Sequence, residues 1–101
     1  MEILYKVEDF IFEDKKQALQ FEEIISNNKF YFKQKKEIYL GIINNLDVTI
    51  YAKEIYDADQ MKQIRIGQIE DLDVTIYAYP KNSWIEMSKI RYLQLNRLKN
   101  F

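Results

Sequence analysis

The chain has 101 residues, of which 48% are hydrophobic and 31% charged, and its formal net charge is −1. This composition is typical of a single folded domain, residues 1–101, and it excludes a disordered chain, an overall basic field for nucleic acid and a membrane-spanning segment. Because Cys and His are both absent, disulfides, thiolate chemistry and imidazole catalysis are excluded, and we expect no metal site and no cofactor.

The segment 1–28 is predicted to form a cap of two strands and one helix. Apolar and polar side chains alternate from about residue 2 to 7, and a second extended run at about 10–13 completes a predicted β-hairpin. Asp14 then has the position of a helix N-cap, with Gln17 at the capping-box spacing. Two strands alone are marginally stable in water, so we expect the helix to cover one face of the hairpin. Its apolar stripe consists of Ala18, Phe21, Ile24 and Ile25.

A seven-residue phrase then occurs twice without change, as Leu46–Ala52 and as Leu72–Ala78. The interval from Leu46 to Leu72 is typical of stacked helical units, and it divides the chain into repeats 29–55, 56–81 and 82–101. Each full repeat is predicted to contain a long helix, a tight turn and a short helix. The predicted fold class is therefore α+β, mainly α, with an N-terminal β-hairpin plus helix followed by about two and a half stacked αα repeats.

The helix starts recur in register with the repeat. Asp57 with Gln60 three residues later, and Ser83 with Glu86 three residues later, are both capping boxes at the start of a long helix. The long helices are predicted to end at Asn45 and Asp71, because both residue types tolerate the left-handed conformation of a helix stop. Two aspartates then cap the predicted short helices: Asp47 caps Val48–Ala52, and Asp73 caps Val74–Ala78.

Arg65 lies on the apolar side of the second long helix, where a charge is costly unless it is paired. The interval from Asp47 to Arg65 is the same as the interval from Asp73 to Arg91. We therefore predict two structural ion pairs between repeats, Asp47–Arg65 and Asp73–Arg91.

Gly41 and Gly67 stand in the interior of the long helices, where glycine costs about 1 kcal/mol relative to alanine. We expect a close approach of the next repeat to compensate for this cost. The last repeat has no successor and carries Leu93 at the same position. Its helix is predicted to run from Trp84 to near Phe101, and either to fold back over the core as a cap, which we favour, or to contact a second chain, as in a homodimer.

The phrase from Gln60 to Gly67, followed by Leu72–Val74 and Tyr77–Pro80, resembles a short helical repeat that occurs in tandem in proteins of low-GC Gram-positive bacteria, often on plasmids, conjugative elements and phages. The resemblance covers residues of about 30 to 95. This chain departs from the usual form where glycine is expected before Leu-Asp-Val, since Asn45 and Asp71 stand there. The resemblance implies a small accessory protein of a mobile element in a bacterial cytoplasm, and it carries over no functional residues.

We expect no enzyme activity and assign no catalytic residue. A nucleophile triad is impossible without His or Cys, and neighbouring carboxylates such as Glu8 and Asp9 stand at turns, where solvated side chains are typical.

Short stacked repeats provide extended surfaces that bind partners, and tyrosine suits such interfaces. We therefore hypothesise a protein-binding factor that inhibits a bacterial defence enzyme, of the anti-CRISPR or anti-restriction type. Its partner would be a larger bacterial protein, a nucleic-acid-processing effector. Residues 1–24 contain 3 basic and 7 acidic side chains, a net charge of −4, so this part of the chain is a candidate mimic of a nucleic-acid backbone. The candidate partner-binding residues are Tyr56 and Tyr79, which we expect to be exposed near the loops between repeats, together with Trp84, Glu8, Asp9 and Glu13.

The alternative is a small DNA-binding regulator that uses the basic C-terminal helix. Lys89, Arg97 and Lys99 on this helix are the candidate contacts with phosphates. Direct nucleic-acid binding is the less favoured hypothesis, because the same residues also fit an ordinary solvated helix face.

Overall fold

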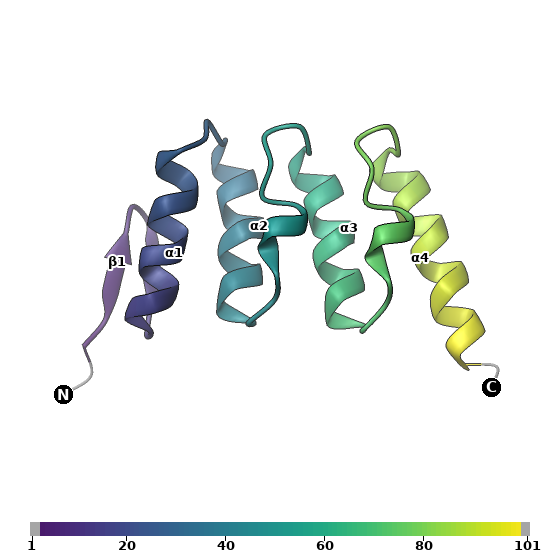
Figure 1. The fold of residues 1–101 in the computed structure, drawn as a ribbon, viewed down its shortest axis with the longest axis horizontal. Helices are drawn as coiled ribbons and strands as arrows, with labels where there is room; N and C mark the ends of the chain where they lie inside the picture. Colours follow the sequence, from purple (N-terminus) through teal and green to yellow (C-terminus); the bar gives the residue numbers. More distant parts are fainter. Residues whose placement is uncertain (1–2, 100–101) are drawn as a thin grey trace.

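The structure is a computed structural model that describes residues 3–99. Its helices stand side by side in one row, with the hairpin at one end and the last helix at the other (Figure 1). The predicted fold class, α+β and mainly α, is confirmed. In chain order the elements are β1 (Tyr5–Val7), β2 (Phe10–Phe12), α1 (Lys15–Ser26), α2 (Phe32–Ile43), the 3-10 turn η1 (Val48–Ile50), α3 (Ala58–Ile69), the 3-10 turn η2 (Val74–Ile76) and α4 (Trp84–Lys99).

The hairpin closes one end of the core. Its strands are antiparallel, with Lys6 opposite Ile11, and they are shorter than the sequence predicts. Phe10 and Phe12 point inward, and their ring centroids lie 5.1 Å and 5.3 Å from that of Phe21 on α1. Both rings also lie 5.0 Å from Tyr39 on α2, so the hairpin covers the junction of the first two helices.

The predicted N-cap of α1 is confirmed, because Asp14 Oδ1 accepts hydrogen bonds from the backbone N–H groups of Lys16 and Gln17. The predicted capping box is wrong in its second half. The Gln17 side chain donates instead to Ile42 O at 2.9 Å and to Asn45 Oδ1 at 3.0 Å. It therefore joins the start of α1 to the end of α2, a contact between helices that local spacing does not reveal.

The predicted helix stops are confirmed, since α2 and α3 end just before Asn45 and Asp71, whose φ angles are 59° and 58°. The segments that follow are single 3-10 turns rather than the predicted five-residue helices. Asp47 and Asp73 cap these turns as predicted, because each carboxylate accepts a hydrogen bond from the backbone N–H two residues later at 3.1 Å.

Both glycines have a different explanation from the one predicted. The close approach comes from the same repeat, not from the next one. A Cβ at Gly41 would overlap the Tyr51 hydroxyl, and a Cβ at Gly67 would overlap the Tyr77 hydroxyl. Each of these fully buried tyrosines donates a hydrogen bond of 2.7 Å to a backbone carbonyl of its own long helix. The glycines therefore let each 3-10 segment lie directly on the helix that precedes it.

Both predicted Asp–Arg pairs are wrong. Arg65 Nε donates to Glu37 Oε2 at 2.7 Å, and Arg91 Nη1 donates to Glu70 Oε1 at 2.5 Å. The Asp47 carboxylate accepts instead from the Thr49 hydroxyl at 2.5 Å, as Asp73 does from Thr75, so both aspartates act within their own turns. Each arginine still pairs with the preceding repeat, but with an acid on the long helix or at its end.

The arginine contacts follow the repeat. Arg91 Nε also donates to Gln63 at 3.1 Å, and Gln63 occupies the position of Glu37 one repeat later. Because Gln63 is neutral, Glu70 supplies the charge for Arg91. Burial alone would lower the pKa of Arg91, but the hydrogen bonds and charge interactions with Glu70 and Tyr92 together outweigh burial and raise it.

The last helix lies beside α3 as the next member of the row, instead of folding back over the core (Figure 1). Its buried residues Met87 and Arg91 face α3, and the Gln94 side chain bonds the backbone N–H and carbonyl of Asp73. The helix is described to Lys99, so Phe101 lies outside the described residues.

Candidate protein-binding edge

The helices α2, α3 and α4 all begin at the same edge of the row (Figure 1). Each 3-10 turn returns the chain to that edge, where a short loop leads into the next helix. Loops 53–57 and 79–83 and the segment before α2 therefore lie along one edge, although a whole repeat separates each from the next in the sequence.

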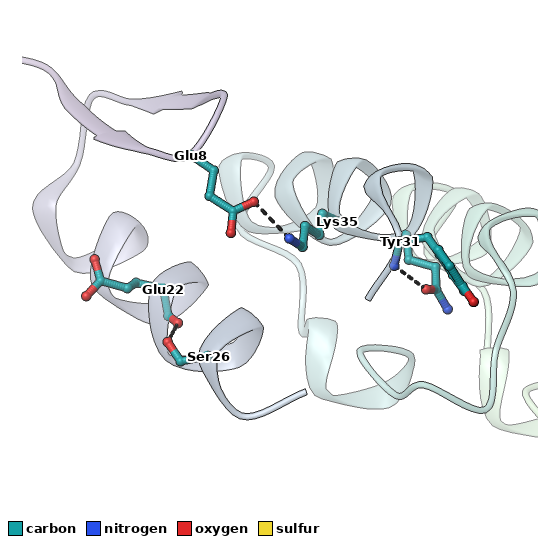
Figure 2. Close-up of polar contacts among 6 residues, drawn as sticks. Glu8, Glu22, Ser26, Tyr31 and Lys35 are labelled. Atoms are coloured by element: carbon teal, nitrogen blue, oxygen red, sulfur yellow. Dashed lines mark hydrogen bonds and ion pairs between the residues drawn. The ribbon is translucent and has the colours of Figure 1, made fainter. Parts of the chain in front are cut away.

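Two buried glutamines set the path of these loops. Gln34 accepts a hydrogen bond of 2.8 Å from the Tyr31 N–H (Figure 2) and donates one of 2.7 Å to Tyr56 O in the next loop. Gln60, at the equivalent position, accepts from Asp57 N–H at 2.9 Å and donates to Asn82 O at 2.8 Å. Each glutamine thus fixes its own helix start to the following loop, which positions the side chains at this edge.

Large apolar side chains are exposed along this edge. Tyr31 is 84% exposed, Ile55 64% and Phe32 57%. Tyr79 and Trp84, which are 49% and 44% exposed, extend this set of side chains along the row. We call these five residues, Tyr31, Phe32, Ile55, Tyr79 and Trp84, the aromatic edge.

A groove of about 520 Å³ opens between the first turns of α2 and α3. One repeat position explains it: this position holds Phe32 in α2 and Trp84 in α4, but only Ala58 in α3, so the space beside Phe32 stays open. The walls are mainly apolar, while charged groups stand at the rim. The lining residues are Tyr31, Phe32, Lys33, Gln34, Asp57, Ala58 and Asp59.

The structure brings together only part of the predicted partner-binding set. Tyr79 and Trp84 lie on the aromatic edge. Tyr56 is only 3% exposed, so its predicted exposure is wrong. Its hydroxyl donates to Ala78 O at 2.7 Å, and burial raises its pKa. Tyr56, the residue before the N-cap Asp57, therefore lies beneath the loop and not on its surface.

The acidic candidates Glu8, Asp9 and Glu13 are exposed, but they belong to the hairpin end of the row and not to the aromatic edge. Glu8 is also engaged, because Lys35 Nζ on α2 lies 2.8 Å from its carboxylate (Figure 2). This ion pair stabilises a hairpin turn in which Glu8 has a φ of 53°, an unfavourable angle for a side chain other than glycine.

The basic candidates Lys89, Arg97 and Lys99 are exposed on α4, the last two in its final turn. Arg91 on the same helix is buried against α3. The aromatic edge was missed in the sequence, where Tyr31 did not stand out. The exchange of Phe32, Ala58 and Trp84 at one repeat position is the signal that would have revealed the groove.

Across residues 3–99, no group of three or more acidic side chains is arranged to hold a metal ion. The same part of the chain contains no helix with the length and apolar character needed to cross a membrane. Comparison of the chain with protein-family models, curated proteins and solved structures gives no match.

Proposed function

We propose that this chain is a non-catalytic protein-binding factor that contacts its partner through the aromatic edge. The observation that carries the proposal is the row of five large exposed apolar side chains beside an apolar groove. Exposed apolar patches of this kind typically mark interaction sites, and aromatic side chains dominate the binding energy of many protein interfaces.

The edge suits binding because its backbone is held in place before a partner arrives. Gln34 and Gln60 are each 6% exposed and bond the loops from below. Tyrosine and tryptophan have only two side-chain torsions, so they lose little entropy when they are buried in an interface. A partner that inserts an apolar side chain beside Phe32, over Ala58, would fill the groove.

For the biological setting, we propose an inhibitor of a bacterial defence enzyme, of the anti-CRISPR or anti-restriction type, acting in the cytoplasm. The resemblance of the repeat to tandem repeats of mobile elements supports this setting. The partner would then be a larger nucleic-acid-processing protein. Asp9 and Glu13 at the hairpin end would add charge complementarity toward a basic cleft of such a partner.

A phage-plating assay tests both parts of this proposal. The chain is expressed in a host with an active restriction or CRISPR system, and we expect a targeted phage to plate more efficiently. Tyr31→Ala and Ala58→Phe should each abolish this gain, the first by removing contact area and the second by filling the groove. Ile69→Ala is the matched control, because Ile69 is 53% exposed but ends α3 at the opposite edge.

Two results would contradict the proposal in different ways. If plating does not change in any defence background, the inhibitor role is wrong. If protection persists in Tyr31→Ala and Ala58→Phe but disappears in Ile69→Ala, the surface is wrong. A purified target, titrated with the same variants, should reproduce the order of effects.

A DNA-binding regulator is the second candidate, supported by the exposure of Lys89, Arg97 and Lys99 on α4. Three phosphate contacts predict a slope of about −2.7 for the logarithm of the binding constant against the logarithm of salt concentration. Lys89→Ala should reduce that slope by about one. No binding to random duplex DNA at low salt would exclude this candidate and leave the protein-binding proposal unaffected.

A further inference from the structure

The two ends of the row carry opposite charges. Residues 3–26, which form the hairpin and α1, contain six acidic and three basic side chains, a net charge of −3. Residues 82–99, which lead into and form α4, contain one acidic and four basic side chains, a net charge of +3. These segments lie at opposite ends of the molecule (Figure 1), whose longest dimension is 47 Å.

The outer face of α4 has no covering segment among the described residues. On α2 and α3, the corresponding face is covered by the tyrosine of the 3-10 segment, which packs over Gly41 or Gly67. On α4, Leu93 takes the glycine position and is 62% exposed. Tyr92 and Ile85 on the same helix are 55% and 49% exposed, and Lys89 takes the position of Glu37 and Gln63.

The opposite end of the row also presents apolar groups beside charges of the other sign. The hairpin turns Phe10 and Phe12 inward, which places Ile11 on its outer face, where it is 50% exposed. Leu19 on α1 is 55% exposed. Glu13 lies near Ile11 at the end of the hairpin, and the Glu22 side chain points away from α2 (Figure 2).

We propose that copies of this chain associate head to tail, with the outer face of α4 on one copy against the hairpin and α1 of the next. Charge decides this arrangement over the alternatives. Two α4 faces would bring Lys89, Arg97 and Lys99 against the same cations, and two hairpin ends would bring acid against acid. A head-to-tail contact pairs the basic end with the acidic one, and it repeats without closing into a symmetric dimer.

The size of the ends makes this association weak. Each end has an outline of 30 by 16 Å, so the contact buries at most roughly 500 Å² on each copy. Stable interfaces bury about 1,200–2,000 Å² in total, so we expect reversible self-association at high protein concentration. Exposed charges are screened at about 10 Å in 0.1 M salt, so added salt should weaken it. The association is independent of the proposed function, because the aromatic edge lies along the row rather than at its ends.

Sedimentation velocity on the full chain tests the inference with charge reversal at each end. One variant carries Lys89→Glu and Arg97→Glu, and the other carries Glu13→Lys and Glu22→Lys. Each variant alone has two ends of like sign, so we expect each to remain monomeric at concentrations where the unmodified chain associates. An equimolar mixture of the two restores opposite charges at every contact, so association should return. Circular dichroism verifies that both variants are folded.

The result expected for the unmodified chain is a sedimentation coefficient that rises with concentration at low salt and falls back in 0.5 M salt. A monomer at every concentration up to about 1 mM, where a contact with a dissociation constant of about 1 mM would already be populated, would overturn the inference. So would a discrete dimer that the α4 variant strengthens, which would indicate a contact between two α4 faces. Self-association that is unchanged in both variants would also overturn it.

Discussion

Arg65 and Glu37 form an ion pair between repeats in which each side chain is only 13% exposed. Removing the arginine would leave the Glu37 carboxylate desolvated and without a counter-charge. This costs more free energy than the loss of the contact alone. We predict that Arg65→Ala lowers the free energy of unfolding by about 3 kcal/mol. Urea denaturation measures this, and a loss below about 0.5 kcal/mol would mean that the arginine is solvated.

Asp47 provides the matched control for that prediction. Its carboxylate caps η1, so Asp47→Ala should cost only about 1 kcal/mol. In double-mutant cycles, Arg65 should couple to Glu37 by roughly 1 kcal/mol or more and should not couple to Asp47. The reverse pattern would restore the pairing that the shared Asp-to-Arg interval first indicated.

The sequence predicts the helix caps made by aspartates but not the acids that pair with the arginines, because the two kinds of contact span different distances along the chain. The caps at Asp14, Asp47, Asp57 and Asp73 depend on backbone groups two or three residues away, so local spacing is sufficient to find them. The partners of Arg65 and Arg91 depend on how two helices are placed relative to each other. A repeat interval reveals that a contact recurs, but not which of several acids reaches the guanidinium.

Buried tyrosine hydroxyls at Tyr51 and Tyr77 give the protein a sensitivity to alkaline pH. Burial raises the pKa of both hydroxyls above the ordinary value of about 10. Their contribution to stability is therefore complete below pH 10 and is lost at higher pH, because the unfolded chain releases the protons first. We predict a free energy of unfolding that falls as the pH rises from 10 to 11 in urea titrations.

Tyr51→Phe with Tyr77→Phe should make that fall shallower, although it lowers stability at neutral pH by removing two hydrogen bonds. Tyr79→Phe is the control, since Tyr79 is 49% exposed on the aromatic edge, and it should leave the fall unchanged. An unchanged fall in the double variant would contradict the assignment to the buried hydroxyls.

At the scale of the element, each 3-10 segment is held against its long helix by one glycine. A Cβ at Gly67 would lie 2.7 Å from Val74 Cγ1 as well as overlapping the Tyr77 hydroxyl. Alanine gains about 1 kcal/mol in helix propensity, but crowding of a packed core costs about 1–3 kcal/mol. We predict that Gly67→Ala is destabilising overall, measured by thermal unfolding.

Tyr77→Phe removes the overlapping oxygen, so it should rescue part of the loss caused by Gly67→Ala. Alone it should cost about 1 kcal/mol, from the lost hydrogen bond to Gln63 O. The two changes together should therefore cost less than the sum of the separate losses. A simple sum would mean that the glycine serves another purpose.

The same element shows where reasoning from the sequence stops being sufficient. The glycine positions and their compensation by close packing are readable from the repeat, because mid-helix glycine needs a reason. Which segment approaches is decided in three dimensions by the return path of the chain. Likewise, the parallel order of the long helices follows from the repeat. The burial of Tyr56 and the exposure of Tyr31 do not, because they depend on where Gln34 and Gln60 hold the loops.

For the whole molecule, the row of helices means that each repeat contacts only its neighbours, so stability is close to a sum of repeat and interface contributions. Inserting a second copy of residues 56–81 after Lys81 adds one repeat whose surfaces already match. Its arginine would meet Gln63 and Glu70, as Arg91 does now. We predict one cooperative urea transition, with a denaturant slope about a quarter larger because the insertion lengthens the chain by about that fraction.

The matched control carries Arg65→Ala in the inserted copy alone, which leaves Gln63 and Glu70 of the preceding copy without their partner. It should lose part or all of the added stability while keeping the helical circular dichroism signal. A separate second transition in the unmodified insertion would instead mean that the inserted repeat folds without contributing to its neighbours. In that case the arginine contacts between repeats would be too weak to make the row a single cooperative unit. The loss in free energy of unfolding predicted above for Arg65→Ala would then be an overestimate.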